Sequence, residues 1–120
     1  MNVSTLSAQV SELAYAFRGY NTTNLGRSNE LLTHSIYQPV VEEKLRQAAD
    51  CCKTITGKDV DLVKRVAEQQ ETDLSSYSEA VALIVAMELA QIELLEVFFD
   101  IHLKAGRLCF GYSLGEIVAL

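Results

Sequence analysis

Cysteine is scarce in this sequence, and the three cysteines follow no metal-binding or disulfide pattern. They are Cys51, Cys52 and Cys109, an odd number without CxxC spacing. Neighbouring cysteines rarely bond to one another, so these positions predict neither a disulfide framework nor a zinc site. We interpret them as free thiols of a protein in the reducing cytoplasm, and we expect no metal.

Clusters of positive charge are lacking too. The chain has 10 Lys and Arg residues against 16 Asp and Glu residues, a formal net charge of -6, and Lys64-Arg65 is its only adjacent basic pair. Phosphate binding requires a clustered basic surface, so the composition argues against nucleic acid as the main partner. An acidic surface mainly favours solubility.

No apolar run of membrane-spanning length is free of charge. Residues 80–99 come closest, but Glu88, Glu93 and Glu96 interrupt them. Each acid would cost about 2.5–3.5 kcal/mol at the centre of a bilayer. The first residues, MNVSTLSAQVSEL, lack the basic start and apolar stretch of a signal peptide. We therefore expect a buried helix over residues 80–99, no membrane association and a cytoplasmic location.

The chain does contain enough apolar residues for one folded core. Hydrophobic residues make up 49% of the sequence and charged residues 22%, which is typical of globular proteins. A length of 120 residues suits one domain rather than two. There is no internal repeat, low-complexity segment or evident linker, so residues 1–120 are expected to form a single domain.

Hydrophobic periodicity and capping residues predict short strands and several helices. Apolar runs over residues 12–17 and 107–111 predict buried strands. After the first run, GYNTTNLG (residues 19–26) predicts a loop whose main-chain N–H groups are able to face a ligand. Helices are predicted over residues 28–34 with Ser28 as N-cap, from Pro39 to near Gly57, after a cap at Asp59, over residues 77–99 after a capping region at Asp73, and from Leu114 onward.

This order of elements predicts an α/β fold. Two strands joined by a helical crossover favour a parallel pair with helices on its faces. Two strands are few for a sheet, which indicates that part of the molecule is absent from this sequence.

The most specific motif lies in FGYSLGEIVAL, residues 110–120. Gly111-x-Ser113-x-Gly115 is the pattern of a serine held on a sharp strand-to-helix turn, where glycines two positions away on either side remove a steric obstacle. The main-chain N–H of the next residue, Leu114, can then stabilise an oxyanion. The alternative interpretation is a tight turn with a buried serine.

GYSLGEIVAL resembles the GHSLGE-type signature of malonyl-CoA:acyl carrier protein transacylases and of the acyltransferase domains of fatty-acid and polyketide synthases. FRGYNTTNLG, residues 17–26, resembles a divergent form of that family's opening strand and loop, FPGQGSQ. Both elements occur in the family's order, and the resemblance extends from about Glu12 to Leu120. It implies the N-terminal portion of an acyltransferase with an α/β-hydrolase-like core and a nucleophile elbow.

The resemblance also implies an activity. Ser113 falls on the nucleophile, and Leu114 and Tyr20 fall on the two main-chain oxyanion donors. A malonyl or related acyl group would pass from CoA, through an acyl-serine, to the phosphopantetheine thiol of an acyl carrier protein, without a bound cofactor.

Three further residues are candidates for binding the substrate: Gly19, Tyr112 and Arg18. Arg18 and Arg27 flank the loop and would bind a CoA phosphate or a carboxylate. For both arginines the alternative is solvation or an ion pair with a nearby acid.

Departures from the family pattern limit what the resemblance implies. Tyr112 replaces a common histidine, Arg18 a proline and Tyr20 a glutamine, and the family's Gln-Pro-Ala-Leu stretch is missing. The family's histidine base and carboxylate-binding arginine lie downstream of the serine, whereas His34 and His102 are not placed by the pattern. We therefore expect an N-terminal fragment with negligible turnover and with self-association through exposed apolar surface.

Two other functions remain open. The same serine could pass its acyl group to water, which would make the protein an acyl hydrolase. Alternatively, the chain is a non-catalytic interaction module whose long apolar helix pairs with a partner.

Overall fold

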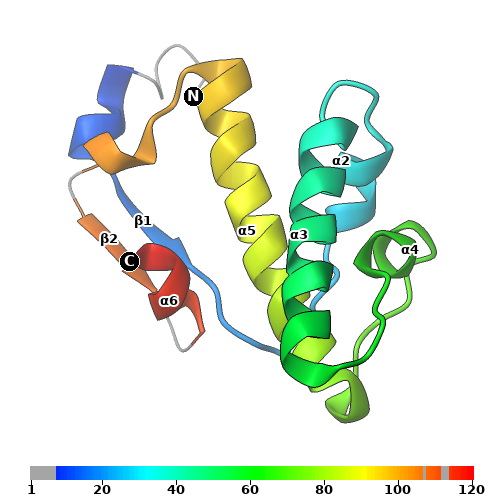
Figure 1. The fold of residues 1–120 in the computed structure, drawn as a ribbon. Helices are drawn as coiled ribbons and strands as arrows, with labels where there is room; N and C mark the ends of the chain where they lie inside the picture. The colour runs from blue at the N-terminus through cyan, green and yellow to red at the C-terminus, as the bar shows by residue number, and fades with distance from the viewer. Residues whose placement is uncertain (1–7, 107, 112–113) are drawn as a thin grey trace.

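Helices form most of the structure, a computed structural model that describes residues 8–106, 108–111 and 114–120. The long α5 lies between α3 on one side and the two strands with α6 on the other (Figure 1). In chain order, with η for a short 3-10 helix, the elements are η1 Val10–Glu12, β1 Ala14–Phe17, α2 Ser28–Thr33, α3 Gln38–Thr56, α4 Leu62–Ala67, η2 Leu74–Ser76, α5 Tyr77–Phe99, η3 Leu103–Ala105, β2 Leu108–Gly111 and α6 Gly115–Ala119.

The signals at the ends of α3 are confirmed. Pro39 stands in its first turn, where a missing N–H costs nothing. Gly57 ends the helix in the left-handed region, at a φ of 74°, and its N–H donates to the carbonyl of Lys53. The predicted caps of two shorter helices are wrong. Ser28 lies inside α2 and is buried, and α4 is capped by Asp61, which accepts a hydrogen bond from the N–H of Lys64, rather than by Asp59.

The capping region before α5 is confirmed in detail. The carboxylate of Asp73 accepts a hydrogen bond from the N–H of Ser76, and the Ser76 hydroxyl accepts one from the N–H of Asp73. From there α5 continues for 23 residues and ends at Asp100, which has a φ of 53°. Among the described residues, no helix combines the length and the hydropathy required to cross a bilayer.

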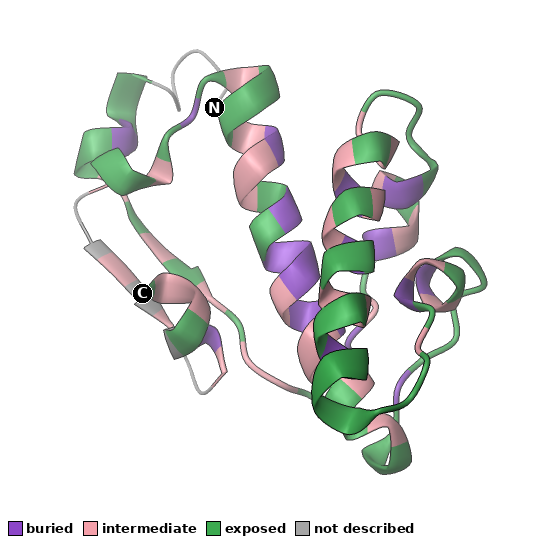
Figure 2. Ribbon diagram, viewed as in Figure 1, coloured by how far each residue is buried: buried purple, intermediate pink, exposed green. Residues whose placement is uncertain are grey.

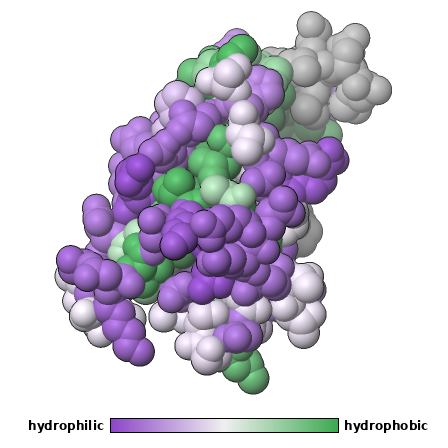
Figure 3. All heavy atoms as spheres, turned by 90° about the vertical axis from the view of Figure 1, so that its right-hand side faces the viewer, coloured by the Kyte–Doolittle hydropathy of each residue, from purple (hydrophilic) through white to green (hydrophobic). Residues whose placement is uncertain are grey.

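The hydrophobic core lies among four helices. The α3 and α5 helices pack along one another, and α2 and α4 close the core from the other side of α3. Figure 2 shows buried residues concentrated on the facing sides of these helices. The face formed by α2, α3 and α4 is mostly hydrophilic, with smaller areas of hydrophobic side chains between the hydrophilic ones (Figure 3). The buried cluster consists of Leu32, Val41, Leu45, Leu62, Val66, Leu83, Ala86, Met87, Ala90 and Leu94.

The two strands form a parallel pair, in register from Ala14 opposite Leu108 to Phe17 opposite Gly111. The pair is shorter than expected, and β1 is more exposed than expected. Along β1, exposed residues alternate with half-buried ones, so the prediction of a buried first strand is wrong.

The predicted α/β fold class with an α/β-hydrolase-like core is wrong. In the described part of the chain the structure is helix-rich, and four-residue strands provide no sheet layer against which helices could pack. Every residue of the buried cluster belongs to a helix. The prediction was based on the order of elements along the chain. Fold class depends instead on which surfaces of those elements bury one another.

Candidate functional site

The two halves of the predicted site meet where the strands end. Gly115, the first residue of α6, packs against the main chain at the end of β1. A Cβ atom at Gly115 would lie 2.0 Å from the carbonyl oxygen of Phe17 and 2.8 Å from that of Arg18, so this approach requires glycine. The second glycine of the GxSxG motif therefore has the steric role expected of it, against a segment about 100 residues earlier in the chain.

The two predicted oxyanion donors are close to this contact along the chain, because Leu114 directly precedes Gly115 and Tyr20 follows Arg18 and Gly19. Tyr20 follows the segment that Gly115 touches, and its ring packs on Tyr77 with centroids 5.0 Å apart. Within the described part of the chain, the main-chain N–H groups of Tyr20 and Leu114 donate to no acceptor. Ser113 and Tyr112 lie outside the described residues, so their predicted roles are untested.

Arg18 is engaged by the loop that it precedes. Its guanidinium donates to the carbonyl of Gly19 at 3.1 Å, to that of Thr23 at 3.2 Å and to Oδ1 of Asn24 at 3.1 Å. These bonds fold the side chain onto the loop. The role predicted for Arg18 and Gly19 in substrate binding stays a prediction.

Asn24 is the buried centre of the loop. Its Oδ1 accepts from Arg18 and from the N–H of Asn21, and its Nδ2 donates to the carbonyl of Asn21 and to the hydroxyl of Thr72. The side chain is only 4% exposed, and both of its polar atoms are satisfied. The loop is therefore held in one conformation by a network that reaches Thr72 on a distant segment.

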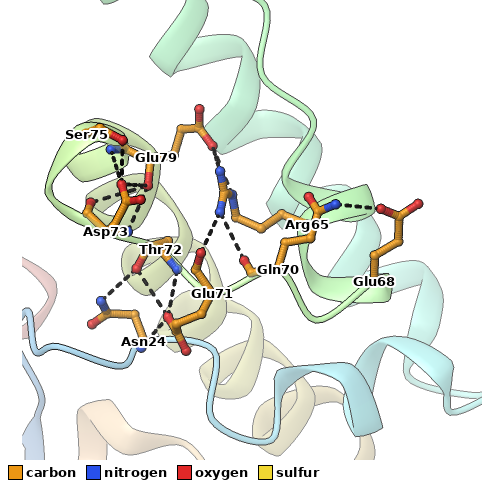
Figure 4. Close-up of polar contacts among 10 residues, drawn as sticks. Asn24, Arg65, Glu68, Gln70, Glu71, Thr72, Asp73, Ser75 and Glu79 are labelled. Carbon is orange, nitrogen blue, oxygen red and sulfur yellow. Dashed lines mark hydrogen bonds and ion pairs between the residues drawn. The ribbon is translucent and has the colours of Figure 1, made fainter.

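The expectation that the loop leaves its N–H groups for a ligand is wrong at two positions. The carboxylate of Glu71 accepts a hydrogen bond from the N–H group of Asn24 at 2.8 Å (Figure 4). It accepts another from the N–H group of Leu25 at 3.4 Å. It also accepts one from Thr72 at 2.9 Å. Burial raises the pKa of Glu71, but these main-chain bonds outweigh it and lower the pKa overall. A carboxylate of the chain itself thus binds the main-chain N–H groups that were expected to face an anionic ligand.

Arg65 holds the segment that carries Glu71. Its Nε and Nη2 contact the same carboxylate oxygen of Glu79, at 2.9 and 2.6 Å. Its Nη1 donates to the carbonyls of Gln70 and Glu71, both at 3.0 Å (Figure 4). Because Arg65 and Glu79 are largely buried, this pair is screened little by water and fixes the turn between α4 and η2.

Neither histidine makes a hydrogen bond or ring contact with the loop in the described part of the chain. The ring of His34 stacks on Tyr37, and its Nδ1 accepts from the N–H of Ile36. The two ring nitrogens of His102 contact carboxylates, Glu96 at 3.0 Å and Asp100 at 2.7 Å. The hydrogen bonds to Asp100 and Glu96 raise the pKa of His102, which favours its protonated form.

Glu88 is the polar residue whose surroundings the sequence did not reveal. It is 8% exposed, and neither of its carboxylate oxygens makes a hydrogen bond with the described residues. Burial raises its pKa, and the main-chain N–H and the charge of Arg18 oppose that increase without overcoming it. The sequence signal for this buried acid is its position inside the apolar run of residues 80–99, where the same acid also argues against a membrane span.

The remaining candidates have simple structural accounts. Arg27 forms an exposed ion pair with Glu30 at 2.7 Å, which is the alternative stated above for this arginine.

An apolar groove of about 570 Å³ runs between α3 and α5 beside Ile55, which is 84% exposed. Self-association through such surface stays a prediction.

Comparison with protein-family models, with curated proteins and with solved structures finds no match. The resemblance to acyltransferases therefore depends on the quoted motifs alone.

Proposed function

We propose that this chain contributes a serine nucleophile to acyl transfer from a CoA thioester, with Ser113 as the attacking residue. The observation that supports it is the contact of Gly115 with the main chain of Phe17 and Arg18. This contact brings Gly115, the second glycine of the motif, to the segment that leads into the loop carrying Tyr20. A site built from two distant segments requires their main chains to approach closely, and glycine at position 115 permits that approach.

The chemistry follows ordinary acyl transfer. The Ser113 hydroxyl loses its proton to a base and attacks the thioester carbonyl, and the main-chain N–H groups of Leu114 and Tyr20 donate to the resulting oxyanion. Collapse of the tetrahedral intermediate releases the CoA thiol and leaves an acyl-serine. A second thiol, the phosphopantetheine of an acyl carrier protein, then takes the acyl group and regenerates the hydroxyl.

The proposal requires a base other than the two histidines. The ring of His34 is stacked on Tyr37 and bonded within the turn before α3, and both ring nitrogens of His102 contact the carboxylates of Glu96 and Asp100, so the described contacts bring neither ring to the loop. We therefore expect acylation of Ser113 by this chain to depend on an added base.

Chemical rescue tests this proposal. The 120-residue chain is incubated with malonyl-CoA over a series of imidazole concentrations, and the product is analysed by intact mass and by peptide fragmentation. We expect one malonyl group on Ser113, in a yield that rises with imidazole. Ser113→Ala should abolish it, whereas Ser35→Ala, which removes an exposed hydroxyl elsewhere, should leave it unchanged.

The fate of the malonyl group on Ser113 separates the remaining alternatives. Transfer to the thiol of an added carrier protein supports an acyltransferase, and rapid release as free malonate supports an acyl hydrolase. An equal low yield on Ser113 and on other serines at every imidazole concentration would contradict both and favour the interaction module.

A further inference from the structure

A second groove is lined by residues of the loop and of α5, among them the buried acid Glu88. It lies between α5 and the segment from the loop to Tyr37, and has a volume of about 580 Å³, within the range of sites for small organic ligands. We name it the Glu88 groove, and its lining includes Arg18, Leu31, Tyr37, Met87, Glu88 and Phe99.

The lining of the groove includes a carboxylate without a partner. Both oxygens of Glu88 are buried and make no hydrogen bond with the described residues. The main-chain N–H of Arg18 is near enough to oppose the rise in the pKa of Glu88, but its distance and angle make no hydrogen bond. The buried acid has thus lost water without gaining a hydrogen-bond partner, which is unfavourable. Its side chain has three rotatable bonds, so a ligand donor in the groove can draw the carboxylate toward itself.

Nearby cations do not satisfy Glu88. Arg18 is close enough to influence its pKa, but the guanidinium is turned to Gly19, Thr23 and Asn24 of the loop. Arg27, at the rim of the groove, is paired with Glu30. The groove thus combines one unpaired acid with apolar and aromatic side chains and with polar ones, of which Arg18, Arg27 and Glu30 are already engaged.

We infer that the Glu88 groove binds a small organic cation, an amidinium or guanidinium carried on an apolar or aromatic body. Two unpaired carboxylate oxygens match two parallel N–H donors, which is the geometry of bidentate pairing. The apolar side chains of Leu31 and Met87 would cover the body of the ligand, and the aromatic rings of Tyr37 and Phe99 favour a cationic or aromatic group. The overall charge of -6 also attracts cations.

Benzamidine and benzamide provide a matched pair of probes, because they share a ring and differ in charge. Each is titrated into the isotopically labelled chain, and binding is followed by the amide resonances of Leu31, Tyr37 and Phe99. We expect saturable binding of benzamidine, and an affinity for benzamide that is lower by about tenfold or more.

Two variants assign the effect to the carboxylate. Glu88→Gln should weaken benzamidine binding by about tenfold or more. Glu93→Gln removes the same charge from the same helix, but at a residue that faces Lys44 and does not line the groove, and should leave binding unchanged. Since Glu88→Gln removes a buried charge, the variant should unfold at the same temperature as the wild type or higher.

Three outcomes would overturn the inference. They are equal affinity for benzamide and benzamidine, unchanged benzamidine binding in Glu88→Gln, and the absence of saturable shifts in the groove. None of these depends on the reactivity of Ser113, so the result is independent of the proposed function.

Discussion

Two regions of the molecule are held together in different ways. The helical body, α2 to α5, buries a continuous cluster of apolar side chains, several of them with no exposed surface. The strand unit, β1, β2 and α6, adds no residue to that cluster and lies on the opposite side of α5 from α3 (Figure 1). The strand unit depends instead on close approach of main chains, at the ladder between β1 and β2 and at Gly115.

The difference shows how the proposed site relates to the stability of the protein. Residues 14–17 pair with residues 108–111, so the whole helical body intervenes in the sequence between them. Contacts of this separation carry a large loop-closure cost, which local helices do not. We therefore expect the helical body to provide most of the free energy of unfolding, and the strand unit to open in smaller fluctuations.

The largest effect is expected for a core truncation in the helical body. Leu45→Ala removes a side chain with 0% exposure and should lower the free energy of unfolding by about 2–5 kcal/mol, measured by urea denaturation. Leu74→Ala is the control, because Leu74 is 82% exposed and its removal should change stability by less than about 0.5 kcal/mol. Similar losses in the two variants would contradict the assignment of the core.

The polar network is expected to contribute less than the core. Arg65→Ala removes the pair with Glu79 and two hydrogen bonds to carbonyls, and should cost about 1.5–3 kcal/mol. Arg46→Ala removes an exposed pair with Glu42 and should cost at most about 1 kcal/mol. Both are measured by urea denaturation. A loss for Arg65→Ala no greater than that for Arg46→Ala would show that the turn is held by other contacts.

Substitutions at two glycines test the stability of the two regions separately. Gly115→Ala places a Cβ against Phe17 and should destabilise the strand unit by about 1–3 kcal/mol. Gly57→Ala has open space around it but a positive φ, and should cost the helical body about 1 kcal/mol. Hydrogen exchange should show faster exchange in β1 and β2 for the first variant alone. Faster exchange throughout α3 and α5 in Gly115→Ala would mean that the regions unfold together.

The smallest effect is a dependence on pH that arises at Glu71. Its pKa is lower in the folded protein, so its stabilisation is present above the unfolded pKa, about 4.3, and is lost as the pH falls through the folded pKa. The difference in the free energy of unfolding between the wild type and Glu71→Gln should therefore shrink on acidification. Glu43→Gln is the control, since among the described residues the carboxylate of Glu43 accepts a hydrogen bond from the side chain of Gln47 and from no main-chain N–H. A difference that is constant with pH would contradict the role of the main-chain donors.

The comparison of predicted and observed elements shows what local patterns can specify. Pro39, Gly57 and the Asp73 capping box predicted helix ends correctly, because a helix end is determined by bonds within a few residues. The caps expected at Ser28 and Asp59 were wrong, since other polar residues nearby compete for the same position.

The candidate site was predictable in part. The steric need for glycine at Gly115 followed from the motif, and the structure adds Phe17 and Arg18 as the segment that it touches. The occupation of the loop by Glu71 could not be predicted, because Glu71 is 47 residues from Asn24 in the sequence. Composition alone does not identify a partner at that separation.

The sequence by itself determined where most helices and the two strands form, because periodicity and capping are local properties. The close approach of Gly115 to Phe17 and Arg18 was decided by the tertiary structure. The tertiary structure alone decided that helices rather than a sheet build the core, that Glu71 fills the loop and that Glu88 is buried without a partner. These outcomes depend on which surfaces meet across the fold, and the desolvation and hydrogen bonding of a residue are set only when they do.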